Sequence, residues 1–196
     1  MRAVRRVTGR AMPLDRADVD TDQIIPAHWL KRVERTGYGA GLFEAWRRDP
    51  AFVMNDPRYS GATILVAGAN FGSGSSREHA VWALEEAGFR AVIAPSLADI
   101  FRANCLKSGL VPVELDADAV TTLLRLVERD PRAEISVDVE ARTVEGPGVR
   151  ASFALDDHSR TRLLEGLDDI AVTLAHADEI TRYESTRATW LPSLRD

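Results

Sequence analysis

Short apolar runs separated by helical patterns dominate the middle of the chain. Residues 62–69, 91–94 and 110–113 are nearly uninterrupted apolar runs that are rich in β-forming residues. Runs of this length are typical of strands that are buried on both faces. Between them, apolar residues recur at helical spacing over 76–87 and 96–108, and a glycine follows each segment. This order of strands and helices predicts right-handed crossovers and a parallel sheet.

Two of the predicted helices have a defined apolar face. The helix over 96–108 is expected to bury Leu97, Ile100, Phe101 and Leu106. A later helix is expected to begin after an N-cap at Asp116 and to run through Arg129. Its buried face would carry Val120, Leu123, Leu124 and Val127.

The last third of the chain changes pattern. The alternation over 135–139 predicts a half-exposed strand that pairs with 149–153 across a turn at 145–148. One or two helices are expected over 157–184, and the last dozen residues resemble a tail. Strands and helices from both parts of the chain therefore indicate an α/β protein.

The length of 196 residues suits a single domain that spans the whole chain, 1–196. Residues 15–60 contain few regular patterns, and long loops of this kind are usually binding loops or disordered. Their six aromatic residues argue against disorder. We therefore expect 15–60 to bind a substrate or a partner, and about 166–196 to form a C-terminal helical extension and tail.

Composition narrows the classes of function. A net charge of −5 argues against a nucleic-acid partner. No apolar run approaches the roughly 20 residues that span a bilayer, and no apolar segment follows the N-terminal arginines as a secretory signal requires. A cytoplasmic protein is the expectation.

The single cysteine, Cys105, restricts metal chemistry. One thiol forms no internal disulfide and cannot hold an iron–sulfur cluster, which takes three or four thiolates. The four histidines lie far apart in the sequence and lack metal-ligand spacing. Any metal must therefore come from a partner, and Cys105 is expected to be a small buried helix residue.

The candidate chemistry lies in residues 72–78, Gly-Ser-Gly-Ser-Ser-Arg-Glu, here called the Gly/Ser loop. The glycines allow a sharp turn and a close approach of the backbone to a ligand. Ser75 and Ser76 are expected at the start of a helix, where free N–H groups and the helix dipole favour anions. Arg77 adds a guanidinium that matches a carboxylate or phosphate. The pattern predicts an anion site with two hydroxyl groups.

Other interpretations of the Gly/Ser loop remain open from these residues alone. The serines would merely cap the helix if Arg77 lay in solvent. The third glycine of a dinucleotide site, the lysine of a P-loop and the Gly-x-Ser-x-Gly of a nucleophile elbow are all absent from the sequence. His79 follows closely on the same helix, and a structural role is favoured for it over a catalytic one.

Four ordered segments carry a family resemblance. The segments are Asn70–Ala80, Asp18–Pro26, 35–47 and 94–101, the last followed by Asn104. The first two resemble the swivelling domain of the aconitase superfamily, and the third is similar to the bacterial 3-isopropylmalate dehydratase small subunit. The likeness extends in order over roughly residues 1–165. It implies a swivelling β/β/α fold with a mostly parallel central sheet and flanking helices.

The same resemblance implies a function. Members are hydro-lyases that act only with a large subunit, in a heterodimer or heterotetramer, and they isomerise 2-isopropylmalate and 3-isopropylmalate in leucine biosynthesis. The small subunit binds no cofactor, and a [4Fe–4S] cluster is expected on the large subunit. The lone cysteine agrees with this division of labour.

Site roles follow from the resemblance, position by position. Ser75 would be the general base, and Ser76 and Arg77 would bind a carboxylate of the dicarboxylate substrate. Asp20, Thr21 and Asp22 would line the same cleft or hold a turn. Leu30 and Val33, in the segment that selects the substrate side chain, would meet an isopropyl group. A related hydro-lyase of the homoaconitase or methylmalate/citraconate type, and a stand-alone anion-binding module, are the alternatives.

Overall fold

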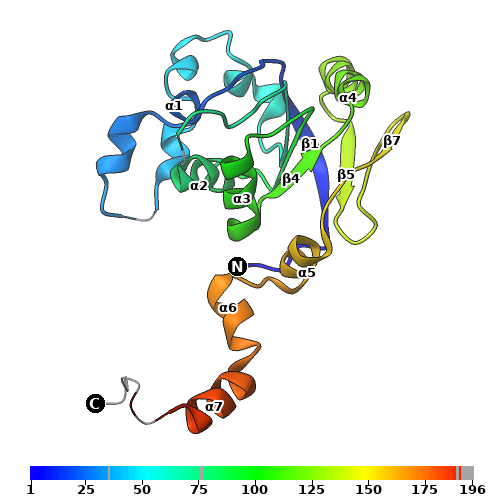
Figure 1. The fold of residues 1–196 in the computed structure, drawn as a ribbon. Coiled ribbons are helices and arrows are strands. Elements are labelled where there is room, and N and C mark those ends of the chain that lie inside the picture. The colour runs from blue at the N-terminus through cyan, green and yellow to red at the C-terminus, as the bar shows by residue number, and fades with distance from the viewer. Residues whose placement is uncertain (35, 76, 189, 191–196) are drawn as a thin grey trace.

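Seven strands form one mixed sheet within the residues that the structure describes, namely 1–34, 36–75, 77–188 and 190 (Figure 1). Their order in this computed structural model is β4-β3-β2-β1-β5-β6-β7. The strands are β1 (Arg6–Leu14), β2 (Ile64–Ala67), β3 (Ala91–Ala94), β4 (Val111–Glu114), β5 (Glu134–Asp138), β6 (Thr143–Gly146) and β7 (Val149–Ser152). The α/β class is confirmed, and the sheet joins a parallel half, β1 to β4, to an antiparallel half, β5 to β7.

Strand β1 belongs to both halves of the sheet. Residues 6–10 pair antiparallel with β5, whereas residues 11–14 pair parallel with β2. This strand is not evident in the sequence, because Gly9, Pro13 and the arginines interrupt its apolar pattern. Pro13 lies beyond the end of the β5 pairing, where a strand tolerates a residue without an N–H group.

Helices cover the parallel half on both faces. α2 (Glu78–Glu86) packs against α3 (Asp99–Ser108), and α4 (Ala117–Arg129) packs across β1, β2 and β3. The sheet separates α4 from the other two helices (Figure 1). This double cover explains why β2 and β3 are buried at every position, as their continuous apolar sequence predicted. The predicted apolar face of α4 is also confirmed.

One detail of the predicted helix over 96–108 is wrong. Leu97 forms a bridge with Phe71, so α3 begins only at Asp99. The buried face of α3 then includes Phe101 and Cys105, four residues apart, and Ile100 falls outside it with 51% of its surface exposed. Gly109 ends the helix in the left-handed conformation, as predicted.

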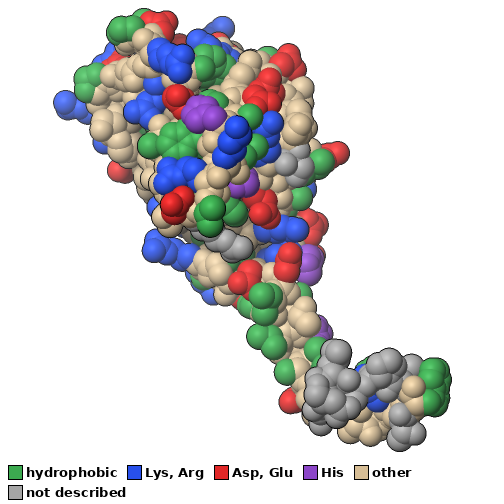
Figure 2. All heavy atoms as spheres, turned by 90° about the vertical axis from the view of Figure 1, so that its left-hand side faces the viewer, with side chains coloured by type: hydrophobic (Ala, Val, Ile, Leu, Met, Phe, Trp, Pro, Cys, Tyr) green, Lys and Arg blue, Asp and Glu red, His purple; other side chains and the backbone are tan. Residues whose placement is uncertain are grey.

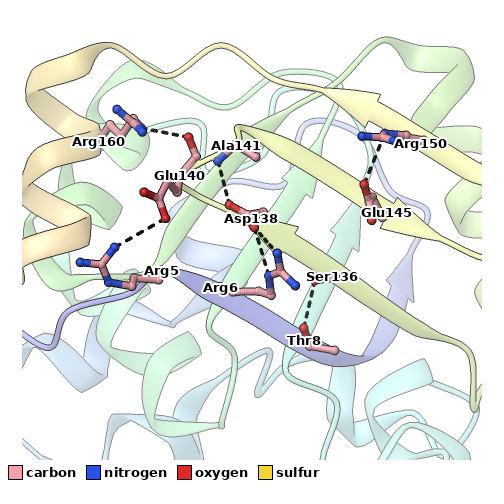
Figure 3. A network of polar contacts seen from close by, with 10 residues as sticks. All are labelled: Arg5, Arg6, Thr8, Ser136, Asp138, Glu140, Ala141, Glu145, Arg150 and Arg160. Atoms are coloured by element: carbon pink, nitrogen blue, oxygen red, sulfur yellow. Dashed lines mark hydrogen bonds and ion pairs between the residues drawn. The ribbon is translucent and has the colours of Figure 1, made fainter.

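The antiparallel half corrects the predicted hairpin. The strand over 135–139 was expected to pair with 149–153, but β6 lies between β5 and β7. An extra turn at 139–142 makes this possible: the Asp138 side chain accepts a hydrogen bond from the Ala141 N–H at 2.7 Å, and Arg142 takes a positive φ of 56°. Polar pairs then line the solvent face, including Arg5–Glu140, Arg150–Glu145 and the hydroxyls of Thr8 and Ser136 (Figure 3).

Residues 15–60 connect the carboxyl end of β1 to the amino end of the parallel strand β2, and they pack against β1 and α2 on the way. Their described part contains α1 (Thr21–Ile24) and five short 3-10 helices. The 3-10 helices are Ala27–Lys31, Tyr38–Gly41, Trp46–Arg48, Val53–Asn55 and Pro57–Tyr59. Tyr38, Phe43, Phe52 and Tyr59 are buried in the core, so the aromatic residues anchor this region as their presence predicted.

The C-terminal part consists of α5 (Asp157–Glu165), α6 (Asp169–Leu174) and α7 (Ala177–Thr186). Three helices therefore replace the one or two that were expected. Neither α6 nor α7 has a buried residue, and both project away from the sheet (Figure 1). Hydrophobic side chains are exposed on this projecting part (Figure 2). Among the described residues, no helix has the length and apolar character to cross a membrane.

Candidate active site

The carboxyl ends of β1, β2 and β3 lie at one edge of the sheet, because these strands run parallel. The segment after each strand contributes to a cluster of loops. Asp20 bridges to Ser73 and Phe71 bridges to Leu97, so the chain after β2 is held between the chains that follow β1 and β3. Open α/β sheets bind ligands at this edge. The Gly/Ser loop therefore lies where the topology favours a site.

Two residues with left-handed backbone hold the entrance to this loop. Asp18 and Asn70 both have a φ of 56°, a conformation that Asp and Asn adopt more easily than other residues with a side chain. The Asn70 amide donates to the Asp18 carboxylate at 2.8 Å, and the Asn70 N–H donates to the Ser96 hydroxyl at 2.9 Å. Such conformations persist where surrounding contacts enforce them, and they cluster at functional sites.

Gly72 allows the loop to pass close to α3. Its φ is 80°, and a Cβ atom at this position would lie 2.2 Å from Cγ of Phe101. The Phe101 ring also packs edge-on against Phe71, with ring centroids 5.3 Å apart. Glycine is thus required here by both backbone and packing, and its close approach is to the protein core.

Thr21 ties the start of α1 to the Gly/Ser loop. The Thr21 N–H donates to the carbonyl of Ser73 at 2.9 Å, and the Thr21 hydroxyl donates to the carbonyl of Ser75 at 2.9 Å. Thr21 is only 2% exposed, so these bonds draw the loop backbone towards the protein interior. The loop is therefore fixed by contacts between segments that lie more than 50 residues apart in sequence.

The helix after the loop begins later than predicted. α2 starts at Glu78, and its N-cap is Arg77, whose backbone is extended and whose side chain makes no capping hydrogen bond. Ser75 is exposed and precedes the N-cap by two residues, so it is neither a helix cap nor a helix N-terminus. Ser76 lies outside the described residues. The helix dipole therefore contributes less to an anion site at Ser75 than was predicted, because its effect fades beyond the first turn.

Arg77 is anchored. Its side chain is only 14% exposed, and Nη1 donates to a carboxylate oxygen of Asp22, which is 56% exposed. The interpretation with Arg77 free in solvent is therefore wrong. A guanidinium has five N–H donors, so the one donated to Asp22 leaves others for a ligand. The pair holds the guanidinium in a defined place, two residues after Ser75 in the chain.

His79 packs among aromatic rings. Its ring lies 5.1 Å from that of Tyr38 and 4.7 Å from that of Trp82, in tilted and edge-on arrangements. Burial lowers the pKa of His79, and the neighbouring Arg77 lowers it further, while Glu78 opposes the change. A neutral ring packed in this way agrees with the structural role that was favoured.

The two predicted specificity residues lie in and just after the first 3-10 helix. Leu30 is half-buried in the 3-10 helix Ala27–Lys31, and Val33 is 93% exposed. The segment around them is secured at its ends. Trp29 donates from Nε1 to Glu44 at 2.6 Å, and Glu86 of α2 accepts from the N–H groups of Gly37 and Gly39 at 3.1 and 2.9 Å.

Sequence reasoning missed several residues that hold the site. Asp18, Asn70, Ser96 and Glu86 make the contacts described above but were not singled out as functional. One signal was present, because Asn next to a glycine-rich turn is a common left-handed residue. The partners of these side chains come from distant segments, and no local pattern identifies them.

The chain's own residues do not fit an iron–sulfur cluster. Cys105 is fully buried in α3, and burial raises its pKa well above the ordinary value, so it is a protonated thiol. Among the described residues, no group of three or more His, Cys, Asp or Glu side chains is arranged to hold a metal ion. Cluster ligation needs several thiolates, which one cysteine cannot supply.

Comparison with known protein families first identifies a domain of the aconitase type. The sequence profile of the aconitase C-terminal domain matches residues 1–118, which include the parallel half of the sheet and the Gly/Ser loop. A second profile, for the C-terminal domain of the 3-isopropylmalate dehydratase small subunit, matches residues 169–194, which begin at α6.

Individual relatives narrow that class. The 3-isopropylmalate dehydratase small subunit of Parafrankia sp. is 62% identical over 95% of each chain, and that of Streptomyces coelicolor is 60% identical over 98% of each. The crystal structure of 3-isopropylmalate dehydratase from Methanocaldococcus jannaschii superposes with a TM-score of 0.65 and 27% identity, covering 91% of this chain and 99% of that one. The chain belongs to the family of 3-isopropylmalate dehydratase small subunits.

Proposed function

We propose that this small subunit supplies one half of a 3-isopropylmalate dehydratase active site, with Ser75 as general base. The complex would interconvert 2-isopropylmalate and 3-isopropylmalate in leucine biosynthesis. One observation carries the proposal: the exposed Ser75 follows a backbone that α1 holds in place, and an anchored Arg77 lies two residues further on. Fixed geometry of this kind is what a catalytic base requires.

Arg77 and Ser76 bind a carboxylate of the substrate in this proposal. The guanidinium is held by Asp22 and is largely shielded from water, which strengthens its attraction for an anion. A guanidinium also matches a carboxylate with two parallel hydrogen bonds. Asp22 is thus a residue that orients Arg77, and the substrate is fixed before any proton moves.

Ser75 then removes a proton from the carbon next to the hydroxyl-bearing carbon. The electrons of that C–H bond form the carbon–carbon double bond as the hydroxyl leaves with its own bonding pair. In the return step, hydroxide adds to the carbon that lost the proton, and the Ser75 proton goes to the carbon that lost the hydroxyl, which gives the isomer. Serine is a weak base in water, so its charged form needs stabilisation, and the nearby Arg77 supports this role electrostatically. General base catalysis contributes about 10²–10⁴-fold in rate.

The other half of the site comes from the large subunit. Membership of the aconitase family suggests that this partner carries an iron–sulfur cluster, and we expect a [4Fe–4S] type, which would supply Lewis acidity towards the hydroxyl group. Residues 15–60 would contact both partner and substrate, with Leu30 and Val33 near the isopropyl group. The exposed Val33 agrees with a surface that another chain covers. A heterodimer or heterotetramer, located in the cytoplasm, is the expected assembly.

The test is reconstitution. The chain is co-expressed with the large subunit from the same organism, and turnover of 3-isopropylmalate, homoaconitate and 2-methylmalate is compared. We expect isomerisation of isopropylmalate to dominate, and no turnover by this chain alone. A complex that prefers a substrate with a third carboxylate would assign a homoaconitase. Dicarboxylate binding by the isolated chain, with no turnover in the complex, would assign a binding module.

A further inference from the structure

We infer that Thr21 is a positioning residue, whose buried hydroxyl fixes the Ser75 carbonyl and thereby aims the Ser75 side chain. The inference rests on the proposed role of Ser75 and changes the role expected for Thr21. It depends on one hydrogen bond, from Thr21 Oγ1 to the Ser75 carbonyl at 2.9 Å, and on the burial of Thr21.

Thr21 is itself held by a small rigid element. Asp20 caps α1 by accepting from the Gln23 N–H at 2.7 Å, and the Asp20 N–H donates back to the Gln23 side chain at 3.0 Å. This reciprocal capping box stabilises a helix of only four residues. Ile24, at the end of the same turn, is fully buried. The Thr21 side chain is therefore attached to a backbone that is held in a fixed position in the core.

A direct contact between Thr21 and the substrate does not fit this arrangement. A threonine hydroxyl has one O–H donor, and here the donor is used by the Ser75 carbonyl. Binding a carboxylate would require that same donor. At 2% exposure, Thr21 also presents almost no surface to a ligand. Its influence on the reaction must therefore pass through Ser75.

The hydrogen bond acts on the least constrained part of the loop. Gly74, immediately before Ser75, has a φ of 85° and is exposed, and α2 begins only at Glu78. Holding the Ser75 carbonyl fixes the backbone from which the Ser75 hydroxyl projects. It also turns the negative end of that carbonyl towards the interior and away from the anions that Arg77 attracts. Both effects favour a productive approach of Ser75 to the substrate.

Arg77 has a separate anchor in Asp22, so substrate binding and base placement are controlled by neighbouring but distinct side chains. Loss of the Thr21 hydroxyl should therefore lower kcat more than it changes KM. A misplacement of about 1 Å costs on the order of 10²-fold in rate. We expect Thr21→Val, which keeps the shape of the side chain, to reduce kcat by about 10–100-fold while KM changes by less than about threefold.

The experiment uses the complex with the large subunit and measures kcat and KM for 3-isopropylmalate. Thr21→Ser retains the hydroxyl and should restore kcat to within about threefold of wild type. Thr122→Val is the matched control, because the Thr122 hydroxyl also donates to a backbone carbonyl, at 2.8 Å, but on the exposed face of α4. It should leave both constants unchanged.

Several results would overturn the inference. They are an unchanged kcat in Thr21→Val, a rise in KM alone, or a failure of Thr21→Ser to restore kcat. If Thr21→Val does not fold, Thr21→Cys replaces it, since a thiol is a weak donor and kcat should fall between the serine and valine values. An inactive wild-type complex would instead contradict the proposed function, so the two failures are distinguishable.

Discussion

The two halves of the sheet differ in where their buried and polar residues lie. In the parallel half, β2 and β3 are apolar and buried throughout, and the loops that follow them at their carboxyl ends contain the polar residues of the candidate site. In the antiparallel half, buried and exposed residues alternate along β5, and charged pairs cover the outer face (Figure 3). The first arrangement gathers distant polar groups at one point, whereas the second distributes them.

This difference indicates where chemistry is possible. The carboxyl ends of the parallel strands bring together the segments after β1, β2 and β3, so Thr21 meets Ser75 and Asp22 meets Arg77, although each pair lies more than 50 residues apart in sequence. In the antiparallel half, the pair Arg150–Glu145 joins two neighbouring strands, and the pair Arg5–Glu140 lies just outside the ends of β1 and β5. Both pairs are largely open to solvent, where each contributes little. We therefore expect substitutions in the parallel half to affect activity and those in the antiparallel half to affect stability mildly.

The largest effect on folding is expected for Gly72→Ala. A left-handed backbone costs a residue with a side chain about 1–2 kcal/mol, and forcing a Cβ atom against Phe101 adds about 1–3 kcal/mol. The melting temperature should fall by roughly 5–15 °C on the scale of about 2–4 °C per kcal/mol. Gly148→Ala, in the turn between β6 and β7, is the control: its φ is 75°, but nothing lies within 4 Å of the new Cβ. Equal losses in the two variants would contradict the packing argument.

The next effect concerns Arg77→Lys. Lysine keeps the charge but cannot pair with Asp22 and a substrate carboxylate in the fixed geometry of a guanidinium. We expect kcat/KM of the complex to fall about 100-fold, or about 2.7 kcal/mol in transition-state stabilisation. The same change at the exposed Arg150, which pairs with Glu145 in the antiparallel half, should leave kcat/KM within about twofold. A lysine variant with normal kinetics would show that Arg77 acts only as a charge.

A smaller effect should depend on pH. Burial raises the pKa of Glu85 in α2 to about 7, although Arg90 opposes the rise. A carboxyl whose folded pKa exceeds its unfolded value favours the folded state at low pH, and this contribution is lost as pH rises through about 7. Glu85→Gln should therefore raise the melting temperature by a few degrees at pH 8 and leave it nearly unchanged at pH 4. Equal gains in melting temperature for Glu85→Gln at both pH values would contradict the assignment.

The smallest effect is expected for Asp138→Asn. Hydrogen bonds from the Ala141 N–H and from Arg6 lower the pKa of Asp138, so its contribution to stability is present at neutral pH and is lost as pH falls below its ordinary value of about 3.8. The variant should lose about 1 kcal/mol in the free energy of unfolding at pH 7, and less at pH 3. Turnover by the complex should stay within about twofold. A tenfold loss of turnover would show that the antiparallel half is more than a scaffold.

The sequence predicted the parallel half better than the antiparallel half, for a physical reason. Strands such as Ile64–Ala67 and Ala91–Ala94 are apolar at every position, so a short run of consecutive residues is enough to predict their burial. β6 (Thr143–Gly146) has only one buried residue and was interpreted as part of a turn. β1 changes partner midway, and such a strand has no single pattern to recognise.

The candidate site likewise has a part that the sequence predicted and a part that it did not. The Gly/Ser loop and its Arg77 were evident from residue types, because glycines, hydroxyls and a guanidinium in one short segment indicate an anion site. The contacts of Thr21 and Asp18 with that loop were not predictable, since each crosses more than 50 residues. The start of α2 at Glu78 depends on the extended Arg77, whose side chain pairs with a distant aspartate.

The central claim is that the chemistry of this chain resides in Ser75 at the carboxyl edge of the parallel half. Its most direct test compares two serine-to-alanine variants in the reconstituted complex. Ser75→Ala should lower kcat for 3-isopropylmalate by about 10³-fold or more with little change in melting temperature, as expected for an exposed general base. Ser136→Ala, on β5, which loses only a hydroxyl contact with Thr8 of β1, should leave kcat unchanged. Turnover in Ser75→Ala that equals the wild-type value would contradict the account.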